Sequence, residues 1–127
     1  MMKSYRIASI PGDGIGIEVV AAGIEVLQDL ADKEGFALAF EHFDWSSARY
    51  QKTGAYIPEG GLAQLKGFDA IFFGAVGAPD VPDHVSLWGL RLPICQGFDQ
   101  YANVRPTRVL PGVTSPLVRG KDIDWVI

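Results

Sequence analysis

The stretch IPGDGIGIEVV, residues 10–20, indicates the class of fold. It follows a short apolar run at residues 5–10, which predicts a strand, and it leads into apolar residues that recur at helical spacing over residues 15–34. The three glycines Gly12, Gly14 and Gly16 predict a tight turn between them, because glycine adopts backbone conformations that other residues avoid. A strand, a turn and a helix in this order are typical of an α/β fold.

This turn differs from the two common phosphate-binding turns. The dinucleotide-binding fingerprint is G-x-G-x-x-G, whereas the spacing here is G-x-G-x-G and Ile17 occupies the next position. No Lys-Ser or Lys-Thr pair follows, as it would in a P-loop, and Asp13 would repel a phosphate. Two interpretations stay open: the glycines only permit a tight turn, or they let the backbone approach a flat cofactor ring.

The rest of the chain continues to alternate strands and helices. The expected elements are a strand at 36–43, a short helix that Ser46 or Ser47 caps, that runs through Tyr50 and that is stopped at Gly54, a helix at 58–65, a strand at 69–73, a helix at 86–98, an extended segment at 103–110 and a strand from Asp124. The strand at 69–73 is so apolar that it should lie mid-sheet with both faces covered. Pro93 should kink or interrupt its helix. The pattern predicts an α/β protein.

Composition narrows the classes of partner. The length of 127 residues suits one domain at most, and the net charge of −4 argues against nucleic acid or an anionic membrane as the main partner. The single cysteine, Cys95, cannot form an internal disulfide, and the N-terminus lacks the apolar run of a signal peptide. These features predict a cytoplasmic protein.

The last residues, DWVI at 124–127, predict a strand that has neither a partner nor a following turn. Natural domains rarely end on an apolar strand at the final residue. We therefore expect residues 1–127 to be an incomplete N-terminal part of a domain, truncated at Ile127. The alternative is a short product without catalytic activity that only folds or binds a partner.

Three motifs in order carry a resemblance to a known family. They are IPGDGIGIEVV at 10–20, FFGAVGAPD at 72–80 and FDQYANVRPTRVLPGV at 98–113, with DIDWVI at the end of the chain. Together they resemble the metal-dependent β-decarboxylating dehydrogenases, which include the isocitrate and isopropylmalate dehydrogenases. Ile17 stands where this family usually has proline, a change that weakens the helix start without touching any chemistry.

The resemblance implies a fold and an activity. The fold would be of the isocitrate/isopropylmalate dehydrogenase type, with this chain as the N-terminal portion of its large α/β domain, and not a Rossmann fold. The activity would be NAD-dependent oxidation of a small 2-hydroxy dicarboxylate, with possible decarboxylation, assisted by Mg²⁺ or Mn²⁺. The sequence leaves the choice between NAD and NADP open. In the family the metal carboxylates and the catalytic lysine lie downstream of this chain, and the lysine comes from a second subunit. The resemblance therefore implies a homodimer, no catalytic residue and no metal ligand within residues 1–127, and no activity for the chain alone.

The resemblance also implies two sets of site residues. Residues that would flank the nicotinamide are Gly14, Ile15, Ala75, Val76 and Gly77, with Gly74 beside them. Arg105 would bind the substrate, because a guanidinium can hold a planar carboxylate with two hydrogen bonds. Without the resemblance, Arg105 would be interpreted as a surface arginine.

Cys95 is the clearest departure from the family. The family commonly has a second substrate arginine at this position, ten residues before the one that matches Arg105. Arg91 lies four residues before Cys95, so one helical turn would place both on the same face. Arg91 therefore either supplies the missing charge or is a solvated helix residue, and the sequence leaves both open.

The segment PDVPDHVSLWGL, residues 79–90, points to the substrate. It looks most like the tartrate- and D-malate-oxidising members of the family. The alternative is a 3-isopropylmalate dehydrogenase, which needs an aliphatic pocket that this segment does not obviously supply. Asp80, Asp83 and His84 lie within it, and we interpret them as polar loop residues and not as metal ligands.

Overall fold

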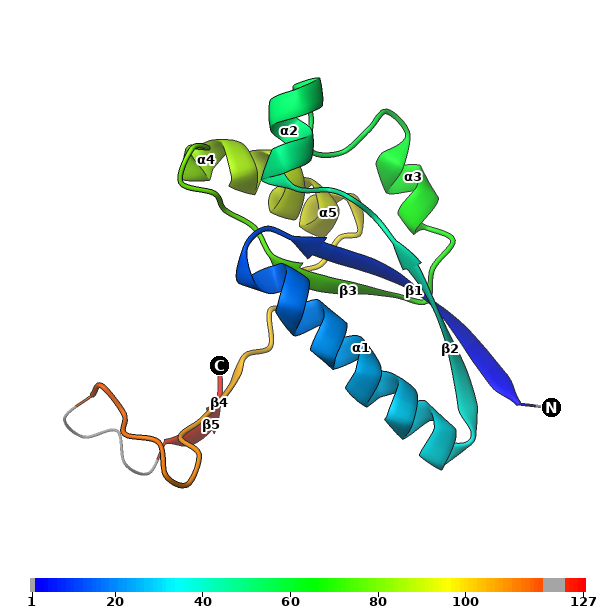
Figure 1. Cartoon of the computed structure of the whole chain (residues 1–127), viewed down its shortest axis with the longest axis vertical. Coiled ribbons are helices and arrows are strands. Elements are labelled where there is room, and N and C mark those ends of the chain that lie inside the picture. The colour runs from blue at the N-terminus through cyan, green and yellow to red at the C-terminus, as the bar shows by residue number, and fades with distance from the viewer. Residues whose placement is uncertain (1, 118–122) are drawn as a thin grey trace. The chain divides into compact units, whose positions relative to one another are not determined.

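The computed structural model describes residues 2–117 and 123–127, which form two compact units that divide after Gly97. The elements are β1 (Lys3–Gly12), α1 (Ile15–Glu34), β2 (Phe36–His42), α2 (Ser47–Thr53), α3 (Gly61–Leu65), β3 (Ala70–Ala75), α4 (Asp83–Ser86), the π-helical segment η1 (Leu87–Arg91), α5 (Leu92–Gly97), β4 (Pro106–Arg108) and β5 (Asp124–Val126) (Figure 1). The chain therefore has the α/β architecture that its sequence predicts.

The first unit is built on a three-stranded parallel sheet in the order β2-β1-β3. Helix α1 runs alongside the three strands, and α2 to α5 gather on the other side of β1 (Figure 1). The middle strand carries the centre of the core, because Ala8 and Ile10 have no exposed surface. Ile7 of this strand pairs with Phe40 on one side and Ala70 on the other.

The expected place of the third strand is wrong. Within residues 2–117 and 123–127, β3 pairs only with β1, so it lies at the edge of the sheet and its residues are at most half-buried. Its apolar character has a local cause in the packing of α1. A Cβ on Gly23 would lie 2.6 Å from the ring of Phe72, so this glycine makes room for the phenylalanine against the helix.

The predicted helix over 15–34 is confirmed in full. It starts after Gly14 and ends at Gly35, whose φ of 75° is left-handed and whose amide donates to the carbonyl oxygen of Ala31. Val20 and Ala31 are buried, so they anchor the inner face of the helix on the sheet.

The two short helices differ from the prediction in their bounds. Ser46 caps α2, since its hydroxyl accepts a 3.2 Å hydrogen bond from the amide of Arg49, and the helix extends past Tyr50 to Thr53 before Gly54 closes it. Helix α3 begins at Gly61 and not at Pro58. Gly60 has a φ of 73°, outside the helical region, and the Pro58 carbonyl only closes a turn with the Gly61 amide.

Pro93 interrupts its helix as predicted. The helical path runs from Asp83 to Gly97, but residues 87–91 form a π-helical turn immediately before it. The amide of Leu92 donates to the carbonyl oxygen of Leu87, five residues earlier. The wider turn accommodates proline, which has no amide hydrogen and whose ring would clash with the carbonyl of an α-helical turn.

The second unit contains a two-stranded antiparallel sheet of β4 and β5. The expectation that the strand at 124–127 lacks a partner is wrong, because the extended segment before it supplies one. The amide of Arg105 donates to the carbonyl of Ile127 over 2.8 Å, and the amide of Ile127 donates back over 3.1 Å. The assignment of residues 1–127 to one incomplete domain stays a prediction.

Candidate functional site

The turn after β1 packs tightly against the end of β3. The amide of Asp13 donates a 2.7 Å hydrogen bond to the carbonyl of Ala75. A Cβ on Gly12 would lie 1.9 Å from that carbonyl oxygen, and a Cβ on Gly16 would lie 2.2 Å from the carbonyl oxygen of Pro11. Gly12 and Gly16 therefore permit a close approach of backbone within the protein. For these two glycines, the tight turn is a sufficient explanation.

Gly14 differs from its two neighbours. Its φ is 52°, and a Cβ built on it would meet nothing within 4 Å. The next residue, Ile15, is 64% exposed. The positive φ explains a glycine at this position of the turn, and the backbone of Gly14 also faces open space at the start of α1.

The segment after β3 forms the other side of the same region. Gly12 pairs with Ala75 across the sheet, so the turn and this segment lie next to each other. A Cβ on Gly74 would lie 2.3 Å from the carbonyl oxygen of Pro11, whereas one on Gly77 would meet nothing within 4 Å. The structure thus brings Gly14 and Ile15, which follow β1, near Ala75–Gly77 at the end of β3. Each of the two segments exposes a glycine.

The side chain of Asp13 links the turn after β1 to the segment after β3. The residue is only 9% exposed, and its carboxylate is directed into the protein. Oδ1 accepts from the amide of Ser47 over 2.7 Å, and Oδ2 accepts from the hydroxyl of Ser47 over 2.6 Å and from the amide of Gly77 over 2.9 Å. A buried carboxylate is tolerated only when donors surround it, and these three donors meet that need.

Ser47 and Tyr56 extend this network. The hydroxyl oxygens of the two residues are 2.7 Å apart, and each residue is only 2% exposed. Burial raises the pKa of the Tyr56 phenol from its ordinary value of 10.0, and the negative charge of Asp13 adds to the rise. The network joins the turn after β1, the start of α2 and the segment after β3.

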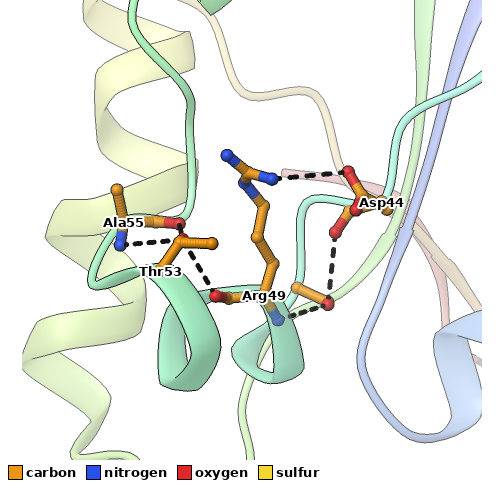
Figure 2. Close-up of polar contacts among 5 residues, drawn as sticks. Asp44, Arg49, Thr53 and Ala55 are labelled. Carbon is orange, nitrogen blue, oxygen red and sulfur yellow. Dashed lines mark hydrogen bonds and ion pairs between the residues drawn. The ribbon is translucent and has the colours of Figure 1, made fainter.

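A second set of polar contacts fixes α2, which carries Ser47 (Figure 2). The hydroxyl of Ser46 donates to the carbonyl of Asp44 over 3.3 Å, and the guanidinium of Arg49 lies 4.0 Å from the carboxylate of Asp44. At the other end, the hydroxyl of Thr53 donates to the carbonyl of Arg49 over 3.0 Å and lies 3.1 Å from the carbonyl of Ala55. Both ends of the helix are therefore held.

The two arginines that the sequence singles out lie in different units. Arg91 is the last residue of η1, and its side chain is exposed, whereas Cys95 in α5 is half-buried. Among the residues that the structure describes, Arg91 makes no ion pair. Arg105 is exposed in the second unit, where its backbone pairs with Ile127.

Sequence reasoning missed Asp13, Ser47 and Tyr56. The sequence presents Asp13 only as a group that would repel a phosphate, and Ser47 only as an alternative helix cap. One signal was available: with Ser46 as the cap, the adjacent Ser47 has a free hydroxyl at a helix start. The partner of that hydroxyl, however, lies 34 residues away in the chain.

Two absences concern the described part of the chain. Residues 2–117 and 123–127 contain no group of three or more His, Cys, Asp or Glu side chains that could hold a metal ion. None of the helices in these ranges combines the length and the apolar composition that crossing a bilayer requires.

Several known proteins are similar to this chain over nearly all of its residues. A probable tartrate dehydrogenase/decarboxylase from Agrobacterium vitis is 65% identical over 99% of the chain, and the D-malate dehydrogenase [decarboxylating] of Escherichia coli K12 is 54% identical over 100% of it. The chain spans 36% of the length of each. The crystal structure of an apo β-decarboxylating dehydrogenase from Thermococcus kodakarensis matches 97% of the chain and 40% of its own length, with 27% identity and a TM-score of 0.66.

The fold and the sequence lead to the same family. The relatives that are similar over the whole chain are dehydrogenases, and the structural neighbour is a β-decarboxylating dehydrogenase. The sequence pattern described as isocitrate/isopropylmalate dehydrogenase matches residues 6–127. The chain belongs to the isocitrate/isopropylmalate dehydrogenase family.

Proposed function

We propose that this chain is part of an enzyme that oxidises the hydroxyl of a small 2-hydroxy dicarboxylate, tartrate or D-malate, with NAD as hydride acceptor. The observation that carries the proposal is the 65% and 54% identity to relatives named for these two substrates. Decarboxylation of the oxidised product is included, because both names contain it. The chain spans 36% of the length of these relatives, so we expect the 127 residues alone to be inactive.

The nicotinamide site is assigned to the region between Gly14 and Gly77. The support is the open space beside both glycines, where an added Cβ would meet nothing within 4 Å. A flat ring can approach a backbone that carries no side chain. Ile15 offers an exposed apolar side chain next to Gly14, and we assign Ala75 and Val76 to the same nicotinamide site.

The carboxylates of the substrate are assigned to arginines. Arg105 is exposed, and two hydrogen bonds to Ile127 hold its backbone in place. A guanidinium presented in this way can bind a carboxylate with two hydrogen bonds. Arg91 is exposed one turn before Cys95, and it is our candidate for the second positive charge.

The remaining chemistry is assigned to parts outside this chain. Mg²⁺ or Mn²⁺ would act as a Lewis acid on the substrate oxygen. The resemblance to the family implies that the ligands of this ion lie downstream of these 127 residues, and the proposal places them there. We also infer a homodimer, because the resemblance to the family implies that a second subunit completes the site.

One comparison tests this proposal. The protein encoded by the complete reading frame is incubated with NAD, Mn²⁺ and either tartrate, D-malate or 3-isopropylmalate, and NADH is followed by its absorbance. We expect reduction with tartrate or D-malate and none with the purified 127-residue chain. Preference for 3-isopropylmalate would favour the alternative enzyme, and absence of reduction with all three would refute the proposal.

A further inference from the structure

The hydrogen bonds around Asp13 have a fixed direction. The hydroxyl of Ser47 has one proton, and it donates that proton to Oδ2 of Asp13. The hydroxyl of Tyr56 must then be the donor in the 2.7 Å contact with Ser47. The network therefore runs from Tyr56 to Ser47 to Asp13, and the amide of Gly77 donates to the same carboxylate oxygen from the other side.

Asp13 holds the segment after β3 at two points. Its backbone amide donates to the carbonyl of Ala75 over 2.7 Å, and its side chain accepts from the amide of Gly77 over 2.9 Å. The two bonds bracket Val76. Gly77 has a φ of 144°, a conformation that side-chain-bearing residues rarely adopt, and no atom packs where its Cβ would be. The carboxylate is therefore the contact that fixes this exposed glycine.

We propose that Asp13 is a positioning residue for the nicotinamide, which it serves by fixing the backbone of Ala75–Gly77. This inference rests on the proposed function, because that function places the ring against this segment. Asp13 does not touch the cofactor in this scheme, since its carboxylate points into the protein. Its effect on the reaction passes through the Gly77 amide.

Replacement of Asp13 by asparagine separates this role from simple folding. The asparagine side chain keeps the shape of the aspartate and one acceptor oxygen for the Ser47 amide. Its amino group would occupy the place of Oδ2, where it can donate to the Ser47 hydroxyl but cannot accept from Gly77. Asp13→Asn therefore removes the acceptor of the Gly77 amide. It also leaves one hydroxyl proton of the Ser47–Tyr56 pair without an acceptor, so a control must disturb that pair alone.

Ser47→Ala is the matched control. It removes the hydroxyl between Asp13 and Tyr56 and leaves a buried phenol without its acceptor, so it should destabilise the protein. It leaves the bond from Gly77 to Asp13 in place. A purely structural role of the network predicts similar kinetics for both variants, whereas the positioning role predicts a difference.

The experiment uses the protein encoded by the complete reading frame. For wild type, Asp13→Asn and Ser47→Ala we would measure KM for NAD, KM for the 2-hydroxy acid, kcat, and hydrogen exchange of the peptide over residues 74–80. We expect Asp13→Asn to speed exchange at Gly77 and to raise KM for NAD by about tenfold, the effect of one unsatisfied polar group, with KM for the acid within about twofold. Ser47→Ala should lower the melting temperature but change KM for NAD by less than about threefold.

Gly77→Ala provides a second route if Asp13→Asn does not fold. Its φ of 144° strains an alanine, and the open space leaves nothing to clash with, so the change alters only the segment. We expect the same selective rise in KM for NAD. The inference is overturned if faster exchange at Gly77 leaves KM for NAD unchanged, if the two KM values rise together, or if Gly77→Ala has no effect.

Failure of the proposed function gives a different result. A wild-type protein that reduces no NAD with any of the acids refutes that function, and the cofactor role of Asp13 with it. Hydrogen exchange needs no cofactor, so it still reports whether Asp13 fixes Gly77. Slow exchange in wild type and fast exchange in Asp13→Asn would then assign Asp13 to the fold alone.

Discussion

The amide of Gly77 donates a 2.9 Å hydrogen bond to the carboxylate of Asp13, 64 residues earlier in the chain. Through this bond the turn after β1 and the segment after β3 form one surface. Backbone is exposed on this surface at Gly14 and Gly77, which have no side chains to cover it. Substitutions of its glycines and of the groups that hold it therefore give the sharpest tests.

Gly16→Ala should destabilise the protein although alanine favours helices. Glycine in a helix costs about 1 kcal/mol relative to alanine. The new Cβ would lie 2.2 Å from the carbonyl oxygen of Pro11 and 2.6 Å from the amide of Ala75, so the backbone must move. Overpacking of this kind costs about 1–3 kcal/mol, and we expect a net loss in the free energy of unfolding measured with urea.

Gly67→Ala is the control for this substitution. The nearest atoms to its added Cβ are 3.6 Å away, an ordinary contact. The free energy of unfolding should change by no more than about 0.5 kcal/mol. Equal effects of the two substitutions would contradict the close approach of the turn to β3.

The stability of the protein should fall at high pH through Tyr56. Burial raises the pKa of this phenol above 10.0, so the unfolded chain loses the proton at a lower pH than the folded protein does. The contribution of Tyr56 is complete below the unfolded pKa and is lost as pH rises through the folded pKa. Urea unfolding between about pH 8.5 and 11 should show a smaller fall for Tyr56→Phe than for wild type. Identical slopes would mean that the phenol is not buried.

Arg105→Lys should weaken turnover in the protein of the complete reading frame. Lysine keeps the charge but loses the planar two-bond grip on a carboxylate. Loss of a charge-assisted pair in a desolvated site costs roughly 2–5 kcal/mol, so kcat/KM should fall by more than about tenfold. Arg108→Lys, three residues along the chain, is the control: this exposed arginine pairs with Asp124 over 3.5 Å and should tolerate the change.

Arg91→Ala tests whether Arg91 takes the role of the arginine that the family commonly has at the position of Cys95. If it does, KM for tartrate and D-malate should rise strongly, while KM for NAD stays nearly unchanged. If Arg91 is only a solvated residue, both constants should stay within about twofold, because exposed substitutions have small effects. Steady-state kinetics with each substrate varied in turn distinguish the two.

Cys95→Arg completes the test of whether a second positive charge binds the substrate. Added to Arg91→Ala, it should restore part of the lost affinity for the dicarboxylate, since the guanidinium returns one helical turn away. Absence of rescue, together with a silent Arg91→Ala, would mean that this protein binds its substrate with one arginine fewer than its relatives.

Local signals in the sequence predicted the long helix but not the order of the sheet. Twenty residues with helical periodicity and a glycine at the end were sufficient for α1, because these signals lie within the helix itself. The apolar run at 69–73 gave no information about its neighbours, so its position at the edge was missed. The start of α3 was misplaced because Gly60, and not Pro58, determines where the helical conformation begins.

The candidate site was predictable only in part, for the same reason. Gly14 and Ala75–Gly77 belong to motifs that the family resemblance identifies. The partners of Asp13 lie 34 and 64 residues away, and no periodicity connects them. The inward direction of its carboxylate follows from the packing of three segments, which only the folded structure reveals.

The parallel pairing of β1 has a consequence for the order of folding. This first strand to be synthesised finds its partners only at Phe36 and beyond and at Ala70 and beyond, so both pairings close long loops. Contacts between distant residues slow the search for the native state, and on the ribosome β1 must wait for β2 and then for β3 to emerge. We expect α1 to form early and the Asp13–Gly77 bond to be among the last contacts of the first unit to close. The surface proposed to bind the nicotinamide would then be among the last parts of this unit to form.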